Sequence, residues 1–183
     1  MTLDEIAPGG ATTTIQSKCR RALWSLTWAA AASWTPRPFH AWRASLLRLF
    51  GASVGKHVHV YPGARIWAPW NLQIGDRSAL ADGVDCYNMA RITIGADVVV
   101  SQRAFLCTAT HAYEQKAFPL MAAPIALDDG VWIAAEAAVM PGVRVGRGAV
   151  VAARSLVVSD VPDDCVVAGV PAHVKGRPGR RLD

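Results

Sequence analysis

The stretch that decides the fold runs from Val54 to Leu80 and reads VGKHVHVYPGARIWAPWNLQIGDRSAL. Within it an aliphatic residue returns every sixth position, with two extra residues between Ile66 and Ile74, and a second residue, usually small, follows four places behind each one. An amphipathic helix would repeat its apolar residues at spacings of three and four, and a half-buried strand would repeat them at two. A period of six fits neither pattern and indicates a hexapeptide solenoid, a chain wound into stacked coils.

The six-residue period continues almost to the end of the chain, with one long interruption. We predict coils of triangular section, whose three sides bring the aliphatic and the small side chains into a narrow interior. Each coil would then bury its apolar side chains against its neighbours. The predicted inward positions are Val54, Val60, Ile66, Ile74, Leu80, Cys86, Ile94, Val100, Leu106, Leu127, Ile133, Val139, Val145, Val151 and Val157. The residues four places behind them are Val58, Ala64, Trp70, Ser78, Val84, Ala90, Val98, Ala104, Thr110, Val131, Ala137, Val143, Ala149, Ser155 and Val161.

Glycines mark the start of the first three coils. Gly55, Gly75 and Gly95 lie twenty residues apart, which sets the length of one full turn. We expect these glycines to occupy corners where a Cβ would strain the backbone.

Size, charge and cysteine usage narrow the class of protein. The 183 residues, 52% of them hydrophobic, suit one domain with a core and exclude a disordered chain. The net charge of +5 is concentrated at the two ends, and no alternation of aromatic and basic residues suggests a nucleic-acid partner. The four cysteines lack CxxC spacing and the first ten residues lack the pattern of a signal peptide, so we predict a cytoplasmic location with reduced thiols.

The chain divides into four segments at the sequence level. We predict a flexible N-terminus (1–17), a helical cap rich in Trp and Arg (18–50), a parallel β-helix (51–170) with an inserted loop (112–126), and a basic C-terminal tail (171–183). The apolar part of the cap is shorter than the roughly 20 residues that a membrane span requires. Residues 20–48 either cover the open end of the solenoid or make peripheral contact with the inner face of the membrane.

The interruption falls after His111 and adds thirteen residues between two coils. Insertions into a regular scaffold are frequent sites of function. A histidine at the base of such an insertion suits a general base, because its ordinary pKa lies near neutral pH, although a polar corner residue without function is the simpler alternative. A zinc site would need three convergent histidines, and His57 and His59 are two coils away from His111.

Several segments resemble the hexapeptide-repeat O-acetyltransferases, a family that includes galactoside, maltose and nodulation-factor acetyltransferases. These segments are Asp129 to Ala135, Pro141 to Gly146 and Val167 to Ala172. Further segments, at Arg37 to His40, Ala68 to Leu72 and Ser101 to Thr108, resemble the colanic acid biosynthesis branch. The resemblance implies a left-handed parallel β-helix, a homotrimer, and acetyl-CoA as co-substrate without a metal ion.

The resemblance also implies roles for individual residues. His111 matches the family's general base for a sugar hydroxyl, and the backbone amide of Ala135 matches its oxyanion donor. The cofactor would contact Trp132, Ala134, Ala135, Ala152, Ala153, Lys175 and Arg177. The family holds its acceptor with an asparagine, but Ala81 stands at that position here, and the candidates that remain for acceptor binding are Asp82, Asp85, Asn88 and Tyr113.

The function predicted on these grounds is transfer of an acetyl group from acetyl-CoA to a sugar hydroxyl. The acceptor would be an exopolysaccharide or its lipid-linked or oligosaccharide precursor, and transfer would be direct, within a ternary complex. Two alternatives are a solenoid with a binding or structural role and no catalytic activity, and a zinc-dependent enzyme of the carbonic-anhydrase type on the same fold.

Overall fold

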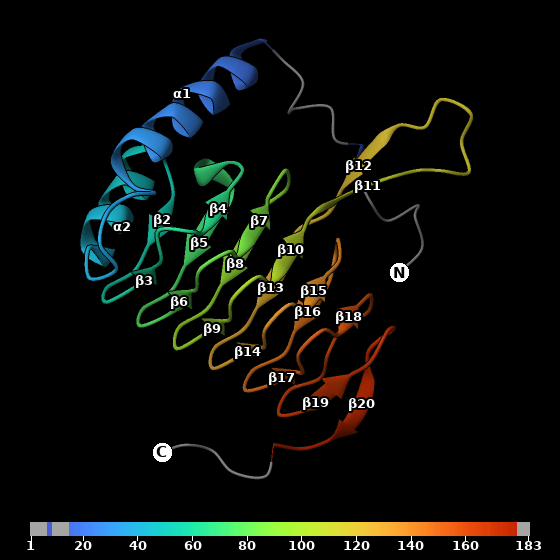
Figure 1. Ribbon diagram of the computed structural model, residues 1–183. Coiled ribbons are helices and arrows are strands. Elements are labelled where there is room, and N and C mark those ends of the chain that lie inside the picture. The colour runs from blue at the N-terminus through green and yellow to red at the C-terminus, as the bar shows by residue number, and fades with distance from the viewer. Residues whose placement is uncertain (1–6, 9–14, 179–183) are drawn as a thin grey trace.

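The computed structural model describes residues 7–8 and 15–178, which form two helices and a stack of short parallel strands (Figure 1). The helices are α1 (Ile15–Ala31) and α2 (His40–Leu49), and a short 3-10 helix, η3, spans Pro69–Asn71. The strands wind into three parallel faces, so the predicted parallel β-helix is confirmed.

Each face of the solenoid is a sheet whose neighbouring strands come from successive coils. The first face contains β2 (Ser53–Val54), β5 (Leu72–Ile74), β8 (Ile92–Ile94), β13 (Ile125–Leu127) and β16 (Arg144–Val145). The second contains β3 (His59–Val60), β6 (Ala79–Leu80), β9 (Val99–Val100), β14 (Trp132–Ile133), β17 (Val150–Val151), β19 (Val166–Ala168) and β20 (His173–Gly176). The third contains β4 (Arg65–Ile66), β7 (Asp85–Tyr87), β10 (Phe105–Cys107), β15 (Ala138–Val139) and β18 (Leu156–Val157).

The register of the strands follows the six-residue period. Ile74 pairs with Ile94, and Ile94 pairs with Leu127, so the thirteen extra residues are looped out without disturbing the stack. Of the fifteen predicted aliphatic positions, all are buried except Val54, which is half-buried on the first coil. The sequence period therefore identified the core.

At one corner the predicted inward residues are wrong. Trp70, Ala90 and Thr110 are only partly buried, whereas Leu72, Ile92 and Ile125 are 3%, 0% and 1% exposed. This corner holds the two extra residues of each early coil, which move the inward position two places along the chain. The expectation of an inward residue four places behind each aliphatic one therefore fails where the coil is longer than three hexapeptides.

The coil-opening glycines have a different physical reason from the one predicted. Gly55, Gly75 and Gly95 do not have positive φ angles; the left-handed residues are His57, Arg77 and Asp97, two places later. A Cβ on Gly75 would lie 2.5 Å from the carbonyl carbon of Gly95 in the next coil. Close approach between coils, and not local backbone strain, requires glycine there.

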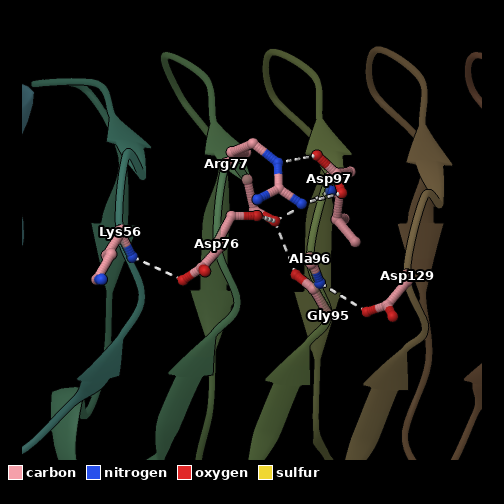
Figure 2. A network of polar contacts seen from close by, with 9 residues as sticks. Lys56, Asp76, Arg77, Gly95, Ala96, Asp97 and Asp129 are labelled. Carbon is pink, nitrogen blue, oxygen red and sulfur yellow. Dashed lines mark hydrogen bonds and ion pairs between the residues drawn. The ribbon is translucent and has the colours of Figure 1, made fainter. Parts of the chain in front are cut away.

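A ladder of side chains joins the coils beside these glycines (Figure 2). Asp76 accepts a hydrogen bond from the Lys56 amide at 2.8 Å, and Asp129 accepts one from the Ala96 amide at 2.7 Å. Arg77 donates two hydrogen bonds of 2.6 Å to Asp97. Each carboxylate thus satisfies a corner amide of the preceding coil or pairs with a cation.

The two helices lie against the first coils, where the solenoid would otherwise end in an open edge (Figure 1). The Trp24 indole of α1 donates to the Ile66 carbonyl at 2.7 Å. Arg43 of α2 is fully buried and donates to the Val60 carbonyl at 2.6 Å and to Thr35 Oγ1 at 2.7 Å. The helical segment therefore covers carbonyl groups of the first coils.

The predicted flexible N-terminus (1–17) and basic tail (171–183) lie partly outside the described residues. Residues 1–6, 9–14 and 179–183 lie outside the described residues. β1 (Ala7–Pro8) pairs antiparallel with a strand of the insertion, and β20 pairs antiparallel with β19. Within the described residues no helix has the length and apolar character needed to cross a membrane.

Candidate active site

The insertion is a β-hairpin, and His111 is the last residue of its first strand. β11 (Ala109–His111) pairs antiparallel with β12 (Leu120–Ala122), with His111 opposite Leu120, and β12 pairs with β1 on its other edge. The hairpin projects from the stacked coils at the corner between the third and first faces (Figure 1). The predicted loop 112–126 therefore contains a strand of this hairpin and also the first two residues of β13.

The His111 imidazole is exposed and held by Phe118, which closes the hairpin. Its Nδ1 lies 3.1 Å from the Phe118 carbonyl oxygen, and the two rings stack with centroids 4.4 Å apart. A carbonyl oxygen only accepts, so Nδ1 carries the proton and Nε2 is the basic nitrogen. This is the tautomer that a general base acting through Nε2 requires.

Phe118 is a functional candidate that the sequence did not indicate. Its φ of 46° lies in the left-handed region, which is rare for a bulky residue. Strained residues of this kind cluster at functional sites, where surrounding structure maintains them. No periodic signal could have found Phe118, because it lies outside the hexapeptide register.

Ala135 lies in a tight turn at the corner between the second and third faces. The Ala137 amide donates to the Ala134 carbonyl at 3.3 Å and Glu136 has a φ of 60°, as in a type II turn with Ala135 at its second position. Among the described residues, no acceptor takes the amide hydrogen of Ala135. The equivalent amides of Gln102 and Ala153 are likewise free of a described partner, so the open N–H is a property of this corner.

An ionic cluster fixes the same corner. Arg103 and Arg154, from the coils before and after, both pair with Glu136, which follows Ala135. The hydrogen bond from Arg154 and the charge of Arg103 hold the pKa of Glu136 below its usual range. The turn that presents the Ala135 amide is thereby tied to both neighbouring coils.

The predicted cofactor residues lie along this one edge of the solenoid. Ala134 and Ala135 follow β14, Ala152 and Ala153 occupy the equivalent places after β17, and β17 pairs directly with β14. Trp132 is 48% exposed, and its indole donates to Ser101 Oγ at 2.9 Å, so its side chain does not belong to the core. Lys175 on β20 and Arg177 just after it are exposed at the end of the same face.

The predicted acceptor residues are mostly engaged elsewhere. Asn88 is fully buried, accepts from the Ala68 amide at 2.9 Å and donates to the Ala68 carbonyl at 2.6 Å, so it bridges two coils and offers no free group. Asp82 pairs with Arg37 at 3.2 Å, and Asp85 pairs with Arg65 at 2.7 Å. Tyr113 is 70% exposed in the hairpin.

One chain does not bring His111 and Ala135 together. Ala135 lies where the chain enters the third face, whereas His111 follows the end of β10, where the chain leaves it. The stretch from Gln102 to Thr108 crosses that face, roughly 15 to 20 Å at the usual rise of a strand. The two groups therefore occupy opposite corners of the same prism.

The histidines do not form a metal site. Among the described residues, no three His, Cys, Asp or Glu side chains lie close enough together to hold a metal ion. His59 stacks on His40 with ring centroids 4.6 Å apart, and His57 is exposed at a corner. The arrangement thus places the candidate base His111 on the hairpin and a separate edge of small residues at the corner of Ala135.

Comparison with known proteins agrees with this geometry. No family model matches the chain. The colanic acid biosynthesis acetyltransferase WcaF of Escherichia coli K12 is 42% identical over 152 residues, which cover 83% of this chain and 84% of that protein. The galactoside O-acetyltransferase of the same organism is 29% identical over 72% of this chain and 66% of the relative.

Solved structures show the same architecture. A hexapeptide-repeat acetyltransferase from Vibrio cholerae, complexed with acetyl coenzyme A, superimposes with a TM-score of 0.82 at 26% identity, over 97% of this chain and 98% of that one. The parallel solenoid and its corner of small residues define the class of hexapeptide-repeat enzymes. With the similarity to WcaF, the chain belongs to the hexapeptide-repeat acetyltransferase family, in its colanic acid biosynthesis branch.

Proposed function

We propose that this protein transfers an acetyl group from acetyl-CoA to a sugar hydroxyl of an exopolysaccharide or of its lipid-linked or oligosaccharide precursor. The observation that carries the proposal is the His111 imidazole, which a hydrogen bond at Nδ1 fixes as a base at Nε2. The names of the relatives support the chemical class, since one is a colanic acid biosynthesis acetyltransferase and another acts on galactosides.

The reaction needs one base and no covalent enzyme intermediate. Nε2 of His111 accepts the hydroxyl proton as the sugar oxygen attacks the thioester carbonyl carbon, which makes a weak nucleophile adequate. The carbon–sulfur bond then breaks, the CoA thiolate takes the proton from Nε2, and the products are a sugar acetate and free CoA thiol. His111 ends in its starting form.

The Ala135 amide supplies the second requirement, a donor for the negative charge that develops on the thioester oxygen. A fixed N–H aimed at such an oxyanion is typically worth a factor of about 100 to 1,000 in rate. Ala135 suits this task because its amide has no described partner and because ion pairs hold the neighbouring Glu136.

The edge beside Ala135 fits the slender pantetheine arm of acetyl-CoA. Two alanines at each of two successive corners leave the backbone accessible, and the exposed Trp132 offers a flat apolar surface. Lys175 and Arg177, at the far end of the edge, supply positive charge for the cofactor phosphates.

A complete site requires two chains, which favours the homotrimer that is usual in this family. His111 and Ala135 lie at opposite corners of one prism, so His111 of one copy would face Ala135 of a neighbouring copy. Three copies around one axis would form three equivalent sites of this kind.

The activity is tested by following free CoA thiol during incubation with acetyl-CoA and oligosaccharides. We expect thiol release only when an acceptor is present, together with a mass increase of one acetyl group on the glycan. Thiol release that is equal with and without glycan would refute sugar acetylation, and binding of acetyl-CoA without turnover would indicate a non-catalytic scaffold.

The shared site is tested by mixing two inactive variants. His111→Ala removes the base, and Ala135→Pro removes the amide hydrogen at a turn position that favours proline. Trimers reassembled from both variants contain sites that pair an intact His111 with an intact Ala135, so activity should return to a substantial fraction of the wild-type value. If the mixture stays inactive although native mass spectrometry shows that subunits have exchanged, His111 and Ala135 do not act across two chains.

A further inference from the structure

A groove of about 460 Å³ lies between α1 and the third face of the first coils, away from the corner of Ala135. Its walls combine aromatic rings with charged groups. The lining residues used below are Arg21, Trp24, Trp28, Arg65, Trp67 and Tyr87, with Asp85 beside Arg65. Flat rings beside hydrogen-bonding groups are the surfaces on which saccharides stack, because one face of a sugar ring is largely C–H.

Two buried hydrogen-bond donors of this groove have no acceptor. Arg21 Nε and the Trp67 indole Nε1 are both buried and lack a partner among the described residues. Unsatisfied buried donors are uncommon and costly, so each requires an explanation such as a ligand oxygen or a bound water. Both belong to one unit, since the Arg21 guanidinium lies over the Trp67 ring at 4.2 Å.

The charge of the groove is positive. Arg65 is neutralised by Asp85 at 2.7 Å, whereas Arg21 has no carboxylate partner among the residues that line the groove. An uncompensated guanidinium with a free N–H, beside an indole N–H, suits an oxyanion that accepts from both. The charge therefore selects an anionic ligand over a neutral one.

The groove also begins near the proposed base. Tyr87, at its rim, accepts a hydrogen bond from the Thr108 amide at 3.1 Å, and His111 follows three residues later. Three extended residues span about 10 Å. A glycan that presents one hydroxyl to His111 would therefore reach the groove with a neighbouring sugar unit.

We propose that this groove binds a sugar unit of the acceptor that carries an oxyanion, either a carboxylate or a phosphate. The aromatic side chains that line the groove contact the sugar, and Arg21 with the Trp67 indole N–H binds the oxyanion. The inference rests on the proposed sugar acetylation for its biological meaning, but binding is measurable without acetyl-CoA and without turnover.

The experiment titrates the full-length protein with four probes: glucuronate, glucose 6-phosphate, glucose and inorganic phosphate. Binding is followed by tryptophan fluorescence and by saturation-transfer NMR. We expect at least one of the two anionic sugars to bind roughly tenfold or more tightly than glucose, and which of them binds identifies the oxyanion. Inorganic phosphate binding as tightly as the anionic sugars would overturn the saccharide assignment.

Matched variants distinguish binding in the groove from nonspecific attraction to positive charge on the helix. Arg21→Gln should lower the affinity for the anionic sugar about tenfold or more, whereas Arg20→Gln should leave this affinity unchanged. Arg20 is a fair control because it precedes Arg21 on the same helix and also lies over a tryptophan, Trp70, at 4.0 Å, outside the groove. Equal losses in the two variants would overturn the proposal.

Two more variants complete the test. Trp67→Phe keeps a ring but removes the indole N–H, so it should lower the affinity for the anionic sugar. Its circular dichroism spectrum should remain that of the wild type. His111→Ala should bind the anionic sugar like the wild type, which separates this proposal from the proposed reaction. Wild-type affinity in Trp67→Phe would remove the indole from the site, and with it the proposed two-donor oxyanion contact.

Discussion

The regular solenoid and the hairpin that interrupts it hold their residues in different ways. In the solenoid, His57 lies at a corner whose amides and carboxylates are tied to the next coil. In the hairpin, His111 lies on a short antiparallel sheet, and Phe118 contacts its ring through a hydrogen bond and a ring stack. The comparison teaches that the repeat fixes its residues through contacts between coils, whereas the insertion holds its histidine through contacts within one hairpin.

Substitution of His111 and, separately, of His57 should give the largest difference in kcat. His111→Ala should lower kcat by a factor of about 100 to 10,000, because it removes the general base. The mutant protein should retain the circular dichroism spectrum and the oligomeric state of the wild type. His57→Asn is the matched control, because asparagine tolerates the φ of 54° at this corner, and its kcat should not change. Comparable activity in the two variants would refute the role of His111.

Two glycine substitutions test what the solenoid corner requires. Gly75→Ala should destabilise the protein by about 3 kcal/mol, near the upper end for overpacking, because its Cβ would meet backbone of the next coil. Gly130→Ala should cost only about 1 kcal/mol, since its φ is +70° but the nearest atom to a new Cβ is 3.8 Å away. Urea unfolding midpoints measure both, and a larger loss for Gly130→Ala would show that local strain, not coil spacing, dominates.

Phe118→Ala tests how the hairpin positions its histidine. Loss of the ring stack should lower kcat about two- to tenfold, as expected for an aromatic contact of about 0.5–1.5 kcal/mol. The Km for acetyl-CoA should not change, because Phe118 lies in the hairpin and not along the edge of Ala135. A change confined to thermal stability would assign Phe118 a purely structural role.

Acidification should destabilise the packing of the helical segment on the first coils. Burial lowers the pKa of His40 below its ordinary value of 6.5, with contributions from His59 and Arg43 against the hydrogen bond to Val60. The unfolded chain therefore binds the proton first, and stability falls as the pH drops from about 7 through the ordinary histidine range. Melting temperatures at several pH values should show this loss, and His40→Gln should reduce it by a few degrees at most.

The sequence predicted the core better than the site because a period averages over many residues while a site depends on a few. Of the fifteen positions in one register only Val54, on the first coil, is not fully buried, and the positions four places behind them fail at Trp70, Ala90 and Thr110, where coil length changes. The side-chain partners of the acceptor candidates could not be predicted from the sequence, because they depend on contacts between coils. Asn88 has the right chemistry for a substrate, but its side chain is buried between two coils.

The groove and Phe118 had no counterpart in the sequence patterns. Arg21 and Trp67 lie far apart in the chain, and only the packing of α1 on the third face places one over the other. Phe118 combines a positive φ with a ring stack, and neither property leaves a trace in hydrophobic periodicity. Both features depend on segments outside the six-residue period, α1 in one case and the hairpin in the other.

The sequence by itself determined the solenoid, its register and the place where the register breaks, because those features repeat and each repeat reports the same apolar burial. The tertiary structure alone decided that the break is a hairpin, that Phe118 fixes the tautomer of His111, and that His111 and Ala135 lie at opposite corners. These outcomes depend on single hydrogen bonds and on the width of one face, which only the folded chain defines.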